Sequence, residues 1–190
     1  MSAGASDSGI AAVDPIAVIA FWRAAGPTKW FAKDSSFDAE IAARFAAVWR
    51  NASAGMVSTW EAAPESALAL AIVLDQFPRN MFRGQAQAFE TDALARAVAD
   101  RAIGRGFDQA VPKSERIFFY LPFEHSENLS DQERAIALIR AIGDAGLVKW
   151  AELHAEVIRR FGRFPHRNPA LGRTTTSAEK AFLDAGGFAG

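Results

Sequence analysis

The sequence has 190 residues, half of them hydrophobic, with 21 Lys and Arg against 22 Asp and Glu. This length suits one domain that buries roughly 70% of the surface its unfolded chain would expose. A formal net charge of -1 excludes a general attraction to nucleic acid, and the absence of cysteine excludes disulfides and thiolate metal sites.

The N-terminal stretch "MSAGASDSG" has neither the basic nor the apolar region of an export signal. The longest strongly apolar run, residues 67–74, is far shorter than the about 20 residues of a membrane-spanning helix. We therefore expect a cytoplasmic protein with no membrane partner and no nucleic-acid partner. Residues 1–13 are expected to be loose, and residues 14–190 to form a single domain.

Apolar residues recur at spacings of three and four along the chain, and alternating strand-like runs are absent. The sequence therefore predicts an all-α fold. The first helix is expected to begin at Asp14 and Pro15, because aspartate caps helices and proline is favoured in the first turn. It is expected to end near Gly26.

Two further helices follow in the first half of the chain. Ser35 and Asp38 have the spacing of a capping box, which predicts a helix from there to about Asn51. Residues 63–78 are apolar nearly all round, which indicates a central, buried helix. Pro78 disfavours the helical conformation of the residue before it, so this helix is expected to end at Phe77.

The second half shows five more helical segments, which brings the total to about eight, mostly antiparallel. A short apolar one is expected to stop at Pro122. Capping boxes at Ser130 and Glu133, and at Thr176 and Glu179, predict the starts of two others. The segments are residues 88–106, 115–123, 131–146, 148–162 and 177–186.

Polar residues cluster where the central helix is expected to end: Asp75, Arg79, Asn80 and Arg83. Arginine is stabilising at the negative end of a helix, and asparagine tolerates the left-handed conformation that follows one. A cap therefore explains this group. Alternatively, the two arginines bind a carboxylate or phosphate and Asn80 contacts a neutral group.

A similar group follows the helix of residues 148–162. Between residues 157 and 178 there are five arginines and one histidine but no acidic residue. Two explanations stay open: these arginines pair with Asp75, Glu124 or Glu127, or some of them capture a small anion. The candidate ligand-binding residues here are Arg163, His166, Arg167, Asn168 and Arg173.

The segment "LPFEHSENLSDQE", residues 121–133, places several ionisable groups in one loop between helices. Glu124, His125 and Glu127 are candidates for general acid–base catalysis, because histidine titrates near neutrality and a carboxylate can orient its ring. The alternative is structural, in which the two glutamates neutralise nearby arginines.

Other kinds of site find little support in the sequence. The three histidines, His125, His154 and His166, do not have the spacing of metal ligands. Neither a nucleophile elbow nor a phosphate-binding glycine loop is present. We therefore expect no metal and no cofactor. Trp30 and Phe31 are expected to pack in the core or to form an apolar pocket wall.

Five motifs occur in the order "WFAKDSSFD", "LAIVLDQFPRNMFRG", "AFETDALARAVA", "FFYLPFEHSENLSDQ" and "FGRFPHRNPALGR". Together they resemble the motifs of a bacterial family of unknown function, DUF924, over about residues 17–183. The resemblance implies an all-α fold like that of tetratricopeptide (TPR) arrays and implies no established activity. Besides the candidates above, the matching residues are Gln76, Ser126, His154 and Arg160.

Three hypotheses follow. The first is a pocket that binds a small anionic molecule, with acid–base chemistry at Glu124 and His125. The second is a TPR-like module that binds an acidic peptide or protein without catalysis. The third is a buried structural network of Arg, Glu and His side chains. The sequence leaves the oligomeric state open.

Overall fold

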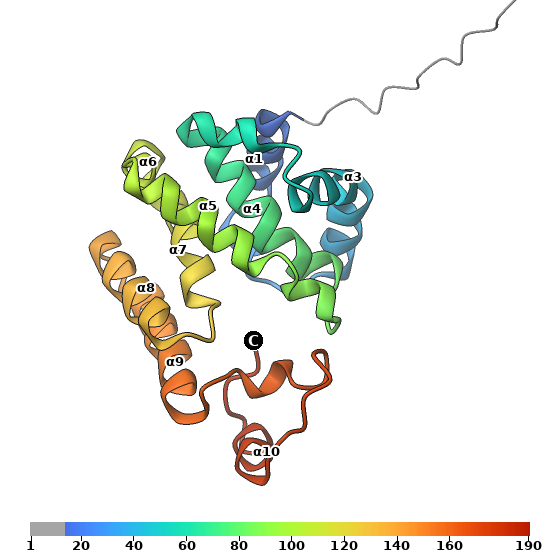
Figure 1. Ribbon diagram of the computed structural model, residues 1–190, viewed down its shortest axis with the longest axis vertical. Helices are drawn as coiled ribbons and strands as arrows, with labels where there is room; N and C mark the ends of the chain where they lie inside the picture. Colours follow the sequence, from blue (N-terminus) through green and yellow to red (C-terminus); the bar gives the residue numbers. More distant parts are fainter. Residues whose placement is uncertain (1–13) are drawn as a thin grey trace, which may run out of the picture.

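The computed structural model describes residues 14–190, so the loose segment expected at residues 1–13 lies outside the described part. Within it the chain forms ten α-helices joined by turns and short 3-10 helices, and no strand (Figure 1). The prediction of an all-α single domain is confirmed. The helices are α1 (Pro15–Ala25), α2 (Pro27–Trp30), α3 (Ser35–Ser53), α4 (Pro64–Met81), α5 (Asp92–Gly104), α6 (Phe107–Ala110), α7 (Ile117–Glu124), α8 (Leu129–Ile142), α9 (Ala145–Phe161) and α10 (Ser177–Asp184).

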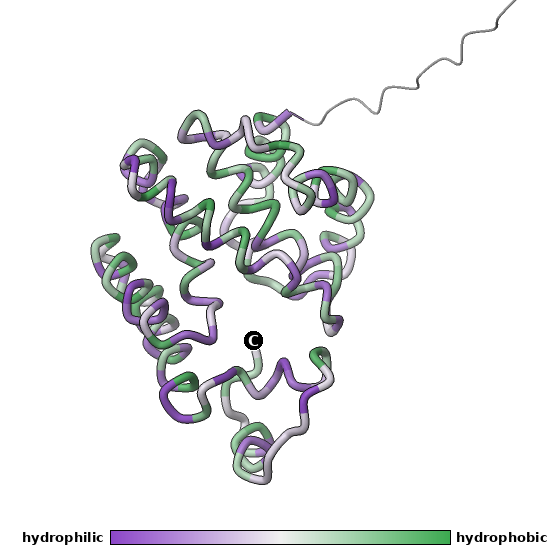
Figure 2. The backbone as a smooth tube through the Cα atoms, viewed as in Figure 1, coloured by the Kyte–Doolittle hydropathy of each residue, from purple (hydrophilic) through white to green (hydrophobic). Residues whose placement is uncertain are grey.

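Helix α4 is the centre of the fold. It packs against α1, α3, α5 and α7, and every residue from Ala67 to Pro78 is buried. Figure 2 shows that much of this helix is hydrophobic, as the sequence predicts. Because α4 is surrounded on all sides, the polar residues of its last turns are also held inside the molecule.

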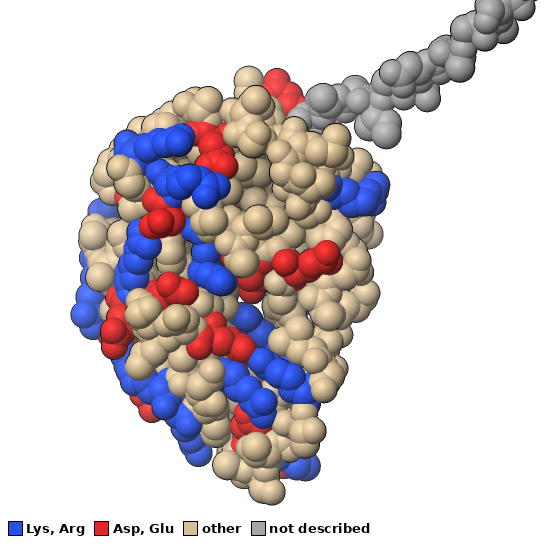
Figure 3. Space-filling model, in the orientation of Figure 1, with Lys and Arg blue, Asp and Glu red and all other residues tan. Residues whose placement is uncertain are grey.

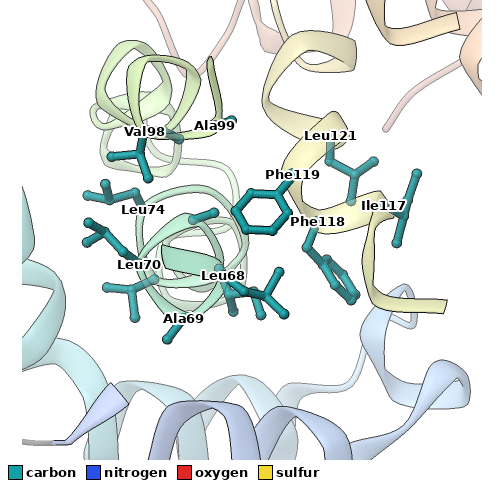
Figure 4. Packing of buried hydrophobic residues seen from close by; sticks show 14 of the residues in the cluster. Leu68, Ala69, Leu70, Leu74, Val98, Ala99, Ile117, Phe118, Phe119 and Leu121 are labelled. Carbon is teal, nitrogen blue, oxygen red and sulfur yellow. The ribbon is translucent and has the colours of Figure 1, made fainter. Parts of the chain in front are cut away.

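Aromatic side chains of α7 close the core around α4. Phe119 points toward α4, beside Leu68 of that helix, and Val98 of α5 lies near the same helix (Figure 4). A smaller apolar cluster, built on Val157, Ile158 and Phe164, holds the C-terminal part of the chain against α9. The core thus reaches the C-terminal segment, which helps to position the site described below.

The structure corrects two predicted helix ends. Pro78 lies inside α4, which continues to Met81, and Pro122 lies inside α7, which ends at Glu124. A proline cannot donate a hydrogen bond to the carbonyl four residues earlier, which for Pro78 is that of Leu74. The Thr91 hydroxyl donates to this carbonyl instead, at 2.6 Å, so that α4 can continue through the proline.

Two of the three predicted capping boxes are also wrong. Helix α3 is capped by Asp34, which accepts hydrogen bonds from two backbone N–H groups, and α8 is capped by Asn128. In both cases a short Asp or Asn side chain upstream of the predicted serine reaches the first turn. The box of Thr176 and Glu179 at the start of α10 is confirmed.

Among residues 14–190 no helix is both long enough and apolar enough to cross a bilayer. The cytoplasmic location stays a prediction.

Candidate functional site

A cavity of about 1180 Å³, here called the larger cavity, lies among α4, α7, α9 and the C-terminal segment, residues 186–190. The end of the chain lies between the last turns of α4 and α10 in Figure 1. The apolar wall includes Trp30, Leu121, Leu147, Trp150, Leu153 and Phe188. The ionisable groups on the wall include Arg79, Glu124, His125, His154, His166 and Arg167. Trp30 and Phe31 thus both line a pocket, while Trp30 also packs in the core.

Asp75 and His125 form a hydrogen-bonded pair beside this cavity. Nδ1 of His125 lies 2.8 Å from Oδ1 and 3.0 Å from Oδ2 of Asp75. Burial raises the pKa of Asp75, but the charge of Arg79 and the contact with His125 outweigh it and lower the pKa to about 2. Because the carboxylate is ionised, Nδ1 carries the proton and Nε2 is left as an acceptor.

The His125 ring is neutral at pH 7. Burial, and then the charge of Arg79, lower its pKa below the ordinary value, although Asp75 acts in the opposite direction. The arrangement therefore combines an ionised Asp75, a neutral His125 and a cationic Arg79. In this state the unprotonated Nε2 can accept a proton from a ligand in the cavity.

Arg79 compensates the charges of two carboxylates. Its two terminal nitrogens donate to Asp92 at 2.9 and 3.0 Å, and Nη1 also lies 3.1 Å from Oδ1 of Asp75. This arginine lines the cavity, but its hydrogen bonds hold α4 to the start of α5. The structure thus assigns Arg79 to an internal network, and a ligand-binding role for it stays a prediction.

Glu124 is a buried carboxyl group at the last position of α7, with 4% of its surface exposed. Burial, with the nearby charge of Asp75, raises its pKa to about 8. Its Oε1 lies 3.1 Å from Nδ1 of His154, but that nitrogen also lies 2.8 Å from the Trp150 carbonyl oxygen.

The contact between Glu124 and His154 has the distance of an ion pair but not its charges. Burial lowers the pKa of His154 to about 3, so its ring is neutral at pH 7, where Glu124 is mostly protonated. Both groups are removed from water, which favours their uncharged forms. Glu124 therefore holds a proton at pH 7, while His125, the next residue in the chain, has an unprotonated Nε2.

Arg167 carries the least compensated charge of the site. It is 6% exposed, its Nη1 donates to the His125 carbonyl oxygen at 3.0 Å, and its Nε is buried without a hydrogen-bond partner. Among the described residues, Asp92, at 3.7 Å, holds the one carboxylate within ion-pair distance. Burial, and then the charge of Arg79, lower the pKa of Arg167 to about 10.

The other candidate arginines are engaged in ion pairs. Arg83 pairs with Asp38, which also accepts from Asn80. Arg163 pairs with Glu179, while Arg173 pairs with Glu127 at 2.7 Å. Arg83 and Asn80 also line the larger cavity, whereas Arg163 and Arg173 do not. The ligand-binding roles predicted for these residues are not tested by these contacts.

Two further candidates lie close to the arginine network. Asn168 is buried and donates to Glu179, so it holds the C-terminal region together. His166 lines the larger cavity, and its Nδ1 is buried without a partner. Burial, and then Arg167, lower the pKa of His166 to about 4, so this ring is also neutral at pH 7.

Sequence reasoning missed Asp92 and Glu179 as ion-pair partners and did not list His154 as a site residue. Asp92 is the first residue of α5, and the fold brings it to Arg79 and Arg167. A carboxylate in the first turn stabilises a helix by itself. The position of Asp92 in the sequence therefore did not indicate that it pairs with arginines. Within residues 14–190 no group of three or more His, Asp or Glu side chains could hold a metal ion.

One family model and one solved structure are similar to this chain. The model of the bacterial protein of unknown function DUF924 matches residues 18–187. The structure of the protein of unknown function ATU0120 from Agrobacterium tumefaciens is 46% identical, covers 90% of this chain and 97% of its own, and superposes with a TM-score of 0.87. No curated protein matches the sequence.

Proposed function

Because the chain belongs to the bacterial DUF924 family, a family of unknown function, we propose its function from the geometry of the site. In this proposal the larger cavity binds a small amphipathic anion and transfers protons to and from it. His125 is the general base, Glu124 is the general acid, and Arg167 binds the acidic group of the ligand.

The observation that carries this proposal is the pair of opposite protonation states on one cavity wall. His125, held by Asp75, is unprotonated at Nε2, while its neighbour Glu124 is protonated because its pKa is about 8. Environments that separate the pKa values of neighbouring groups in this way are typical of acid–base catalysis. A purely structural network gains nothing from a carboxyl group held protonated near neutral pH.

The buried guanidinium of Arg167 supports an anionic ligand. Its Nε has no partner, and its pKa is lowered to about 10 because burial disfavours the cation. An oxyanion in the larger cavity, which Arg167 lines, would supply the negative charge that its partners inside the protein do not. The face shown in Figure 3 has interspersed positive and negative groups, so such recognition would be local.

The apolar wall supports a ligand with a hydrophobic body. Trp150 is 56% exposed and Leu153 is 39% exposed, although both line a cavity in which Leu147 and Leu121 also lie. Exposed large apolar side chains grouped in this way are typical of binding sites. Such a wall would bind an aromatic or aliphatic chain, with the acidic group directed at Arg167.

One observation favours the alternative, a peptide-binding module without catalysis. Residues 187–190, which have no regular secondary structure, form part of the cavity wall, where the Phe188 ring packs against His154 with 4.3 Å between ring centroids. A segment of the chain itself thus packs at the larger cavity, as a bound peptide would. An external peptide would have to displace this segment.

The tautomer of His125 tests the catalytic part of the proposal. NMR spectra that correlate the ring nitrogens with the protons on the ring carbons should show, at pH 7, a protonated Nδ1 and an unprotonated Nε2. The reason is that the Asp75 carboxylate accepts a hydrogen bond from Nδ1. Asp75→Asn is the matched variant, in which this preference should weaken. A wild-type ring protonated at Nε2 would remove the proposed base.

Ligand titration tests the binding part. We expect phenylacetate or hexanoate to bind to the wild type and to perturb the ring resonances of His125 and His154. Arg167→Gln should weaken binding about tenfold or more, because a hydrogen bond to a charged group is lost. His125→Gln should change the affinity much less. Calorimetric titration measures these affinities.

Arg134→Gln is the matched control, because Arg134 forms an exposed ion pair with Asp100. If both carboxylates fail to bind at millimolar concentration while the acidic peptide Glu-Phe-Ala-Gly binds, the peptide-binding alternative holds and the proposal is wrong. An Arg167→Gln protein that binds phenylacetate as well as the wild type would remove the role of Arg167.

A further inference from the structure

A second cavity of about 710 Å³, here called the smaller cavity, adjoins the larger one. Three residues line both cavities: Phe89, His125 and Arg167. The rest of its lining is Asp92, Arg96, Ser126, Glu127, Asn128, Leu129 and Leu171. This lining is mostly polar, in contrast with the aromatic and aliphatic wall of the larger cavity.

Two helices begin at the smaller cavity. Asp92 is the first residue of α5, which has 13 residues, and Leu129 is the first residue of α8, which has 14. The backbone N–H groups and the positive end of the helix dipole lie at such starts and favour anions. The N-cap residue of α5, Thr91, gives no side-chain hydrogen bond to the first turn, because its hydroxyl donates to Leu74.

The carboxylates on this lining are already paired. Asp92 accepts two hydrogen bonds from Arg79, and Glu127 accepts two from Arg173, at 2.7 and 3.0 Å. Arg96 is held more loosely, with Nε 3.5 Å from Asp131. The acidic side chains of the lining therefore leave little uncompensated negative charge to repel an anion.

Arg167 is the independent observation that points to a ligand. The side chain is 6% exposed, lines the smaller cavity and has a buried Nε without a hydrogen-bond partner. A helix start by itself is a common feature, and Asn128 already caps α8. The start of α5 has no such cap, and it lies beside a buried guanidinium whose one carboxylate neighbour among the described residues is 3.7 Å away. The loosely paired Arg96 adds a second cation to the lining of the smaller cavity.

We infer that the smaller cavity is a second ligand site, which takes the carboxylate or phosphate group of a second reactant. Arg96 and the start of α5 hold the oxyanion, and Arg167 contacts it from the wall common to both cavities. Two ligands would then meet at His125. This inference rests on the proposed function for its role in catalysis, but binding at the smaller cavity can be tested by itself.

Inorganic phosphate and acetate are the probes, and their affinities are measured by calorimetric titration at low ionic strength on the full chain. We expect Arg96→Gln to weaken phosphate binding about tenfold or more and Arg96→Lys to recover part of the loss. Arg96→Gln should leave the affinity for phenylacetate nearly unchanged, because Arg96 lines the smaller cavity and not the larger one. Acetate binding without phosphate binding would assign the site to carboxylates.

Trp150→Ala is the matched variant for the larger cavity and should weaken phenylacetate binding while phosphate binding stays unchanged. The inference is overturned if Arg96→Gln, folded by circular dichroism, binds both probes as the wild type does. It is equally overturned if neither probe binds the wild type at millimolar concentration. If phosphate binding depends on Arg96 but phenylacetate does not bind, this site stands and the proposed function falls.

Discussion

Replacing Asp75 with alanine is expected to lower the free energy of unfolding by about 3–5 kcal/mol, the usual cost of breaking a buried ion pair. Asp75 is fully buried and contacts both Arg79 and His125. Without the carboxylate, Arg79 keeps Asp92 as its partner, but the His125 Nδ1–H loses its acceptor in a region removed from water. The decrease in the free energy of unfolding should be largest at neutral pH, where Asp75 is ionised.

Chemical denaturation of the wild type and of Asp75→Ala measures this difference. Asp100→Ala is the matched control, because Asp100 forms an ion pair with Arg134 at the surface, where such pairs contribute less than about 1 kcal/mol. A loss below 1 kcal/mol for Asp75→Ala would mean that water or a rearranged side chain replaces the carboxylate. The Asp75–His125 pair would then be too weakly held to orient a catalytic base.

The same experiment bears on the third hypothesis, that the charged residues form a structural network. Asp75 is expected to stabilise the fold and to orient His125, so its loss alone cannot separate structure from catalysis. Arg167 separates them better. It lines both cavities, and Arg167→Gln should therefore alter ligand binding more than replacement of a purely structural residue would.

The sequence predicted the helices well because their signals are local. Apolar spacing gave the all-α class and the burial of α4, and the capping box of Thr176 and Glu179 marked the start of α10. The end of α4 was wrong for a reason that is not local. Pro78 is tolerated because Thr91, 17 residues from Leu74, donates to the Leu74 carbonyl oxygen.

In the candidate site, too, the sequence predicted local features but not contacts between residues distant in the chain. The sequence placed ionisable residues at helix ends, but it could not show that His125 contacts Asp75, which lies 50 residues earlier. It left the arginine partners open among Asp75, Glu124 and Glu127. The structure pairs Arg173 with Glu127 and leaves Glu124 beside His154. Which arginine keeps an unpartnered N–H depends on all these distances together.

The second large effect concerns Glu124, and it depends on pH. The pKa of this carboxyl group is raised from 4.5 to about 8 because the group is buried. Between these two values the unfolded chain releases the proton while the folded protein keeps it, so the contribution of Glu124 to stability falls as the pH rises. At pH 7 the accumulated cost is on the order of 3 kcal/mol, at about 1.4 kcal/mol per pH unit.

Glutamine has nearly the same shape and does not ionise. The free energy of unfolding of Glu124→Gln, relative to that of the wild type, is therefore expected to rise by up to about 3 kcal/mol when the pH is raised from 4.5 to 7. Urea denaturation at several pH values measures the difference. His166, whose pKa is lowered, acts in the opposite direction, but it is present in both proteins and cancels in the comparison. His154 contacts Glu124, so its pKa is measured by NMR in both proteins.

The exposed Glu133 supplies the control for loss of one carboxyl group, as Glu133→Gln. A stability difference between Glu124→Gln and the wild type that stays constant from pH 4.5 to 7 would show that the Glu124 carboxyl ionises in the folded protein as readily as in the unfolded chain. Glu124 could then not serve as a proton donor at neutral pH. If the difference does grow with pH, the protein bears a cost in stability at neutral pH to keep one carboxyl group protonated beside an unprotonated histidine, which a structural role for Glu124 does not explain.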